Sequence, residues 1–307
     1  MLNDMNSTEL FCNYYKQWID VYKKDAIRDA TLAKYRMTHK WVERLVPELK
    51  VSDLTRTVYQ KLLNDYAKEH ERQTTLDFHH QLKGAILDAV DEGLIERDPT
   101  RKAIIKGKMP KPKKIKYLNQ FELHTLISHL NIKEAPNWDW FILLVAKTGM
   151  RFSEALAVTP ADFDFEKRTV TINKSYQRLN GQDLITTPKT EKSNRVITMP
   201  QFLAEEIQDY LKMLYGIGAD DRMFTVTKSY LHREMDRGSK EAGVPRIRIH
   251  DIRHSAVSLL IDMGFSATAI ADRVGHESID ITYNYAHLFP SKQTEMADKL
   301  DFERMGA

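Results

Sequence analysis

The chain has 307 residues, of which 42% are hydrophobic and 29% charged, as is typical of folded globular domains, and it is long enough for two of them. The formal net charge is only +3, and no apolar run approaches the roughly 18 residues that a membrane helix needs. These values argue against a disordered chain and against a membrane-spanning one.

The single cysteine and the first residues of the chain indicate the cellular compartment of the protein. Cys12 alone cannot form an internal disulfide or a cysteine-based zinc site, which fits a reducing environment. The start, "MLNDMNSTEL", is polar and acidic, unlike a secretory signal. We therefore expect a cytoplasmic protein without a membrane partner.

Residues 8–106 show apolar side chains at helical spacing. Examples are the segments "STELFCNYYKQWIDVYKK", "DATLAKYRMTHKWVERLV", "TRTVYQKLLNDYAKEH" and "TLDFHHQLKGAILDAVDEGLI". No heptad pattern is sustained, so a coiled coil is not indicated. The pattern predicts a small domain of four or five helices over residues 1–107.

The positive charge is concentrated in one stretch. Residues 101–116, "RKAIIKGKMPKPKKIK", hold eight basic residues and no acidic one, whereas residues 1–100 hold 15 basic and 17 acidic residues and residues 117–307 hold 23 and 26. Two prolines stiffen the stretch. We predict an interdomain linker over residues 108–116 that lies along DNA; the alternative is a solvated tether. The predicted DNA contacts are Lys108, Lys111, Lys113 and Lys114.

A second domain is predicted over residues 117–307, mainly helical with one small antiparallel sheet. "LNQFELHTLISHL" and the very apolar "NWDWFILLVAKTG" read as helices, the first with Asn119 as its cap. "KRTVTINKSYQ", "QDLITTP" and "RVITMP" read as strands, with Asn180-Gly181 as a hairpin turn. The chain then returns to helices, and the last is expected at about residues 291–305.

Several polar residues stand at helix starts and turns in this second domain. Each has an ordinary interpretation: Arg151 could pair with Glu154, and a turn lysine is most often solvated. His250 and His254 are spaced for a metal pair. We reject a metal site because Arg253 projects from the same turn and no third carboxylate ligand is evident.

Taken together, the order arginine, turn lysine, His-x-x-Arg, Gly-His and tyrosine resembles the tyrosine recombinase, or phage integrase, family. The matching stretches are "TGMRFSEAL", "PKTEKSNRVITMP", "HDIRHSAVSLLIDMG" and "VGHESIDITYNYAHL", within about residues 117–290. The resemblance implies a helical, SAM-like core-binding domain followed by a catalytic domain. It implies catalytic roles for Arg151, Lys189, His250, Arg253, His276 and Tyr285.

The resemblance also chooses between two tyrosines. In the family the nucleophile follows the Gly-His histidine by nine residues and is usually followed, two residues on, by another histidine. Tyr285, with His276 and His287, has both spacings, and Tyr283 has neither. On a helix the two tyrosines would point about 200° apart, so only one could face the arginines.

The implied substrate is a DNA phosphodiester. Tyr285 would form a 3′-phosphotyrosine, Arg151, Arg253 and His276 would bind the phosphate, and Lys189 would protonate the leaving oxygen. His250 would be the complementary acid or base, and Glu154 would orient Arg151. No metal, ATP or other cofactor is implied.

The implied assembly is a homotetramer that acts on paired double-stranded DNA core sites through a Holliday junction. The C-terminal tail would dock on a neighbouring protomer, and accessory DNA-bending or directionality proteins would assist. Many integrases carry a further N-terminal domain that binds arm sites, and this chain begins almost at the first core-binding helix.

Two alternatives remain open from sequence. A type IB topoisomerase would share the chemistry without exchanging DNA partners. A non-catalytic DNA-binding protein could use the same scaffold, although the complete set of six residues argues against it. The helical domain, basic linker and tail favour a recombinase.

Overall fold

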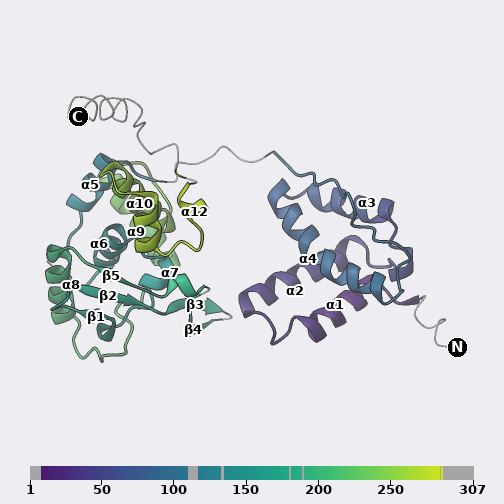
Figure 1. Cartoon of the computed structure of the whole chain (residues 1–307), viewed down its shortest axis with the longest axis horizontal. Coiled ribbons are helices and arrows are strands. Elements are labelled where there is room, and N and C mark those ends of the chain that lie inside the picture. Colours follow the sequence, from purple (N-terminus) through teal and green to yellow (C-terminus); the bar gives the residue numbers. More distant parts are fainter. Residues whose placement is uncertain are drawn as a thin grey trace, which may run out of the picture. The chain divides into compact units, whose positions relative to one another are not determined.

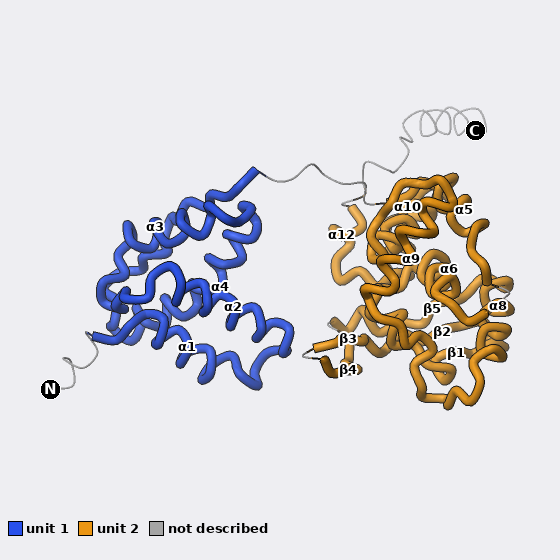
Figure 2. The backbone as a smooth tube through the Cα atoms, turned by 180° about the vertical axis from the view of Figure 1, so that it is seen from behind, with its two compact units in different colours: residues 1–113 blue, residues 114–307 orange. Residues whose placement is uncertain are grey.

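The computed structural model describes residues 8–109, 117–132, 135–179, 181–188, 190–283 and 285. It divides into two compact units, residues 1–113 and 114–307 (Figure 2). Each unit has its own hydrophobic core. Within the described ranges, no helix has both the length and the apolar character to cross a membrane.

Unit 1 is helical, as its sequence predicts (Figure 1). Its described helices are α1 (Phe11–Tyr22), α2 (Asp29–Leu45), α3 (Arg56–Ala67) and α4 (Arg72–Asp91). Aromatic and aliphatic side chains from α1, α3 and α4, including the fully buried Tyr15, Tyr59 and Leu82, fill the core. The Thr55 hydroxyl accepts a hydrogen bond from the Val58 amide and so caps α3.

The chain after α4 returns to pack against this unit. The Lys108 amide donates to the His70 carbonyl at 2.8 Å, and Lys108 forms a parallel bridge with Glu71. A Cβ at Gly107 would lie 2.1 Å from the Arg72 nitrogen, so only glycine allows this approach. Lys108 is therefore fixed through its backbone to unit 1, although its side chain is exposed.

Unit 2 is mainly helical. Its described α-helices are α5 (Gln120–Ser128), α6 (Trp138–Thr148), α7 (Phe152–Ala155), α8 (Gln201–Met213), α9 (Lys228–Glu241), α10 (Ile252–Asp262), α11 (Ala267–Val274) and α12 (Ile279–Tyr283). Asn119 caps α5 in a reciprocal capping box with Glu122, as predicted. Helix α6 is buried along almost its whole length and forms the centre of the core, packed against α10.

The strands form two small antiparallel sheets, where the sequence predicts one. Strands β1 (Phe163–Asp164), β2 (Thr169–Ile172) and β5 (Arg195–Thr198) make one sheet in the order β1-β2-β5. Strands β3 (Ser175–Leu179) and β4 (Gln182–Thr186) make a separate hairpin. The predicted strand "KRTVTINKSYQ" is interrupted after Ile172, so its two halves belong to different sheets. Figures 1 and 2 both place the hairpin at the end of unit 2 away from α8.

The mainly helical class with small antiparallel sheets is confirmed, and the single sheet is corrected. The connection over residues 190–194 leads into β5 through a 3-10 turn at Glu191–Ser193, and β5 belongs to a different sheet from the hairpin. This connection brings Ser193 and Arg195 beside the start of α7.

Candidate active site

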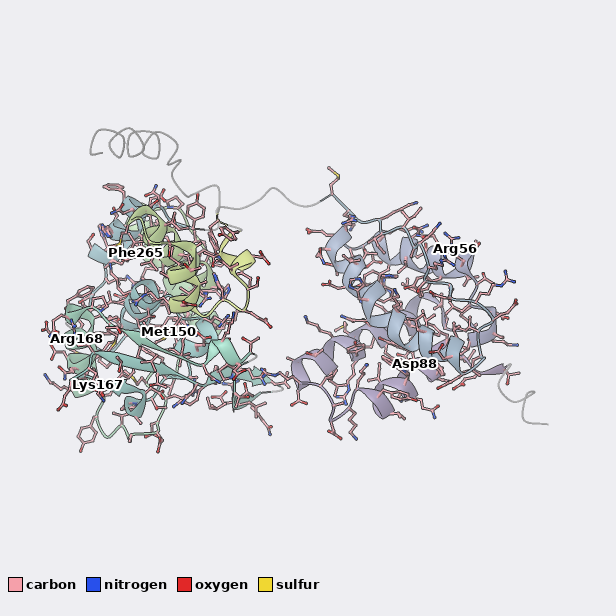
Figure 3. The ribbon with its side chains drawn as sticks, viewed as in Figure 1. Arg56, Asp88, Met150, Lys167, Arg168 and Phe265 are labelled. Atoms are coloured by element: carbon pink, nitrogen blue, oxygen red, sulfur yellow. The ribbon has the colours of Figure 1, made fainter. Side chains whose placement is uncertain are left out.

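Two glycines with left-handed backbone conformation end helices at the site. Gly149, with φ of 68°, ends α6, and Gly275, also at 68°, ends α11. A Cβ on Gly149 would lie 2.8 Å from a methyl group of Val274, so the two helix ends pack directly together. Figure 3 marks Met150, which follows Gly149 and precedes Arg151, inside unit 2.

Arg151 is held at the start of α7 by three elements. Its Nη1 donates to Glu154 Oε1 at 2.7 Å and to Ser193 Oγ at 3.1 Å. Its Nη2 donates to the Gly275 carbonyl at 2.7 Å. The side chain retains 30% exposure, so the guanidinium is oriented by the protein and still accessible from solvent.

Arg253 is almost fully buried on α10. Its Nη1 donates to the carbonyls of Gly149 and Val274, each at 2.7 Å. Burial and the positive charge of Arg151 lower the pKa of Arg253 to about 9, so the group remains cationic at neutral pH. These bonds join the C-terminal ends of α6 and α11, where unpaired carbonyls favour a cation.

His276 follows Gly275 and is also buried. Its Nδ1 lies 2.7 Å from the Thr282 hydroxyl on α12, which fixes the ring. Burial, together with Arg253 and Arg151, lowers the pKa of His276 to about 4, so the imidazole is neutral at physiological pH. A neutral ring held through Nδ1 can offer Nε2 as a hydrogen-bond donor to an anion.

A buried ion-pair network supports Arg151. Glu154 is 2% exposed and also accepts from Arg195 Nη2 at 2.9 Å. Burial opposes ionisation of Glu154, but its bonds to Arg195 and Arg151 outweigh this and hold the carboxyl pKa below its ordinary value. Arg195 was not singled out from sequence, because its partner stands 41 positions away.

Arg195 also reaches the far side of the site. Its Nε donates to the Arg273 carbonyl at 3.0 Å and its Nη1 to the Ser193 carbonyl at 3.0 Å. A Cβ on Gly275 would lie 3.0 Å from the Arg195 side chain. One side chain therefore joins β5, α7 and the end of α11.

The two tyrosines near the end of the described chain differ in environment. Helix α12 ends at Tyr283, which is 53% exposed, and Tyr285 lies just beyond it, half-buried against Val257, Ile261 and their neighbours. The Tyr285 hydroxyl hydrogen-bonds to Nδ1 of His254. Burial raises the pKa of Tyr285 to about 12, although Arg253 opposes the shift.

His250 lies in the 3-10 turn Ile249–Asp251 that leads into α10, and the residue is exposed. Partial burial of its ring and the charge of Arg253 lower its pKa. Its ring meets His254 edge to face, with centroids 5.9 Å apart. In the part of the chain that the structure describes, no cluster of three or more His, Cys, Asp or Glu side chains could hold a metal ion.

Several residues with predicted roles in catalysis, DNA binding or assembly cannot be placed in the site. Lys189, His287, the tail of residues 290–307 and the linker lysines Lys111, Lys113 and Lys114 lie outside the described residues. Five of the six predicted catalytic residues are described, all in unit 2, and contacts or electrostatic interactions link them into one cluster around Arg253.

The cluster combines two arginines, a neutral buried histidine and a phenol. Arg151 lies close enough to Arg253 to lower its pKa, so a bound anion would relieve the repulsion between the two guanidinium groups. Their planar forks suit phosphate oxygens. The phenol gives the site a group that can form a covalent ester. The arrangement therefore fits phosphoryl transfer to tyrosine.

Comparison with known proteins identifies the family. Residues 116–292, more than half of the chain, match the model of the Phage integrase family. The chain therefore belongs to the phage integrase family, and the resemblance seen in its sequence is confirmed. It is 34% identical over 227 residues to the ICEBs1 integrase of Bacillus subtilis (strain 168); the match covers 69% of this chain and 61% of that integrase.

Solved structures share the fold. The Tn1549 transposon integrase (aa 82-397), in complex with circular intermediate DNA, has a TM-score of 0.76 at 18% identity and covers 95% of this chain and 98% of its own. A lambda integrase tetramer bound to a Holliday junction has a TM-score of 0.66 at 16% identity, covering 90% and 80%.

Proposed function

We propose that this chain is a tyrosine-type site-specific DNA recombinase, an integrase that cleaves and rejoins double-stranded DNA core sites in the cytoplasm. The observation that carries the proposal is the cluster of Arg151, Arg253 and His276 beside Tyr285 in a chain of the phage integrase family. The DNA-bound integrases of the same fold support DNA as the substrate.

Arg151 and Arg253 would bind the nonbridging oxygens of the scissile phosphate. Their anchoring to Glu154 and to helix-end carbonyls leaves them little freedom, so the site needs little reorganisation when negative charge grows in the transition state. His276 would donate to the same phosphate through Nε2.

Tyr285 would attack phosphorus, forming the 3′-phosphotyrosine and releasing a 5′ oxygen that Lys189 protonates. The new ester conserves the energy of the broken bond, so rejoining needs no ATP, and the arginines supply the positive charge. Rejoining to a second DNA end, through a Holliday junction, gives recombination. His250 would complete the acid–base set from the open side of the cluster.

The decisive test is to recover the covalent adduct. The purified chain is incubated with DNA from the mobile element that encodes it. The reaction is then denatured, and the DNA strand that remains linked to the protein is sequenced. We expect one specific strand attached at its 3′ end through tyrosine. A reaction with two marked sites should exchange ends; relaxation of supercoils without exchange would point to a topoisomerase, and absence of any adduct would contradict the proposal.

The basic linker is proposed as a DNA contact that continues from the anchored Lys108. Changing Lys108, Lys111, Lys113 and Lys114 to Gln should weaken binding and flatten its salt dependence. Each lost phosphate contact should reduce the slope of log affinity against log salt by about 0.9. Binding is measured over a salt series on one core site.

The matched control removes lysines that already pair with carboxylates. Lys68, Lys167 and Lys212 are exposed and lie within 3.0 Å of Asp65, Asp164 and Asp209; Figure 3 marks Lys167. Their change to Gln should leave the slope near the wild-type value. Equal slopes for the linker variant and the wild type would show that the basic stretch is only a tether.

An apolar groove offers a docking surface for the C-terminal tail. It has a volume of about 720 Å³ and lies among α5, α6, α8, α10 and α11. Phe202, Met263 and Phe265 line it and are 45%, 60% and 49% exposed. Figure 3 marks Phe265 on the side of unit 2 that carries α5 and α10.

We propose that the tail of a neighbouring protomer occupies this groove in a homotetramer on DNA. In the tail sequence Met296 and Leu300 are four residues apart, and Phe302 adds a third apolar side chain. Because the tail follows Tyr285, its docking could govern when the nucleophile is presented. Accessory DNA-bending or directionality proteins would act on the same assembly.

Removing residues 291–307, or changing Phe265 to Asp, should spare binding to one core site and reduce tetramer assembly on paired sites. Sedimentation of the protein–DNA complexes measures this. Tyr215→Asp, at a fully exposed aromatic outside the groove, is the control and should assemble normally. Normal tetramers from the truncated chain would mean that the tail packs on its own protomer or has no role.

A further inference from the structure

The hydrogen-bond partner of the nucleophile is a histidine outside the six predicted positions. Nδ1 of His254, on the first turn of α10, bonds to the Tyr285 hydroxyl, and the two ring centroids lie 5.5 Å apart. A phenol at neutral pH carries its proton and donates it in such a bond. Nδ1 is then the acceptor, so the ring carries its own proton on Nε2.

The other side of the His254 ring faces a buried carboxylate. Nε2 lies 3.8 Å from Asp251 Oδ1, and Asp251 is 1% exposed. Arg248 holds this carboxylate with two bonds, from Nε to Oδ2 at 2.9 Å and from Nη2 to Oδ1 at 3.0 Å. The resulting order is Tyr285, His254, Asp251 and Arg248.

The Asp251 carboxylate offsets positive charge close to His254. His254 follows the cationic Arg253 directly in the chain, a charge on His254 acts on the neighbouring His276, and His250 meets the His254 ring edge to face at 5.9 Å. A proton arriving on His254 would be repelled by Arg253. Asp251 supplies the opposite charge on the far side of the ring and favours the imidazolium that forms.

This is the arrangement of an activated nucleophile, in which a hydroxyl contacts a base and a further group orients that base. His250, which the family resemblance places in the acid–base set, contacts the ring of His254, whereas the phenol bonds to His254 itself. The two histidines therefore occupy different positions relative to the nucleophile.

We propose that His254 is the general base that accepts the Tyr285 proton during DNA cleavage, and that Asp251 is its positioning residue. The inference rests on the proposed recombinase function. In the forward step the tyrosine O–H bond breaks as its proton moves to Nδ1, and the phenolic oxygen bonds to phosphorus. The bond from phosphorus to the 5′ oxygen breaks, and that oxygen takes a proton from the separate acid, Lys189. Rejoining reverses each transfer, and His254 returns its proton to the phenol.

The test variant is His254→Asn in the full chain. The asparagine amide can occupy the place of Nδ1 and keep a hydrogen bond to the phenol, but it cannot accept a proton at neutral pH. We expect DNA binding and thermal unfolding close to wild type, and adduct formation slower by about 10²- to 10⁴-fold, the range for losing a general base. The substrate is the duplex whose cleavage site the adduct sequence defines.

Two further readouts separate a base from a structural contact. Replacing Tyr285 by a fluorinated tyrosine, whose phenol is more acidic, should restore much of the rate in His254→Asn and change the wild-type rate far less. A duplex with sulfur in place of the leaving 5′ oxygen needs no acid, so it should rescue Lys189→Ala and not His254→Asn. The control His129→Asn alters an exposed histidine at the end of α5 and should react normally.

The outcomes are distinct. Unchanged or faster cleavage by His254→Asn would overturn the base assignment and leave the recombinase proposal standing. Rescue of His254→Asn by the sulfur substrate would make His254 an acid, and failure of the fluorinated tyrosine to restore rate would make its contact structural; each overturns the base assignment. A wild-type chain that forms no adduct would instead contradict the proposed function.

Discussion

Tyr285→Phe should abolish covalent adduct formation while DNA binding survives. The change removes only the hydroxyl oxygen that would attack phosphorus, and the ring can still pack against Val257 and Ile261. The arginines and histidines of the described cluster cannot replace that oxygen, so the expected loss is complete. Adduct is measured by denaturing electrophoresis of labelled DNA, and binding by mobility shift.

Tyr283→Phe is the matched control because it removes the same atom two residues earlier. Tyr283 is 53% exposed at the end of α12, so its hydroxyl is not held in the arginine cluster, and the variant should still trap DNA. A covalent adduct from Tyr285→Phe would show that the nucleophile has been assigned to the wrong residue.

Arg195→Met should destabilise unit 2 by about 3–5 kcal/mol, the cost of breaking a buried ion pair and leaving one charge behind. Glu154 would lose the partner at 2.9 Å and keep only Arg151, which is 30% exposed. Adduct formation should also fall, because Glu154 and the end of α11 both position Arg151. Denaturant unfolding measures the free energy, and Arg195→Lys should recover part of it.

The same variant predicts a change with pH. The folded-state pKa of Glu154 is lowered, so its stabilisation is fully present above the ordinary carboxyl pKa and is lost as pH falls through the lower folded value. The free energy of unfolding, measured with denaturant at neutral and at acidic pH, should therefore fall less for Arg195→Met than for the wild type.

Arg178→Met is the control for this ion pair. Arg178 is 56% exposed and pairs with Asp183 at 3.4 Å on the hairpin, so its removal should cost at most about 1 kcal/mol. Equal unfolding midpoints for Arg195→Met and wild type would mean that the buried network contributes nothing to stability.

The sequence predicts the elements well where the signal is local. Helical periodicity predicts the helices of unit 1, and Asn119 caps α5 as expected. The order of four separated motifs identifies the family, which the match over residues 116–292 confirms.

The features of the site that could not be predicted from the sequence depend on contacts between residues far apart in the chain. Arg195 meets Glu154 across 41 positions, and His254 meets Tyr285 across 31. Each residue alone reads as an ordinary surface or helix side chain, since no local pattern encodes a partner so far away. The division of the strands into two sheets has the same cause, because pairing of β2 with β5 skips the intervening hairpin.

The anchoring of Arg253 makes assembly of the site depend on how the chain folds. Its Nη1 joins the ends of α6 and α11, so the guanidinium occupies its position only when both helices have docked. A partly folded chain in which these two helix ends have not met would lack the anchor of Arg253 and therefore the assembled arginine cluster. Formation of the cluster thus depends on completed folding of this part of unit 2.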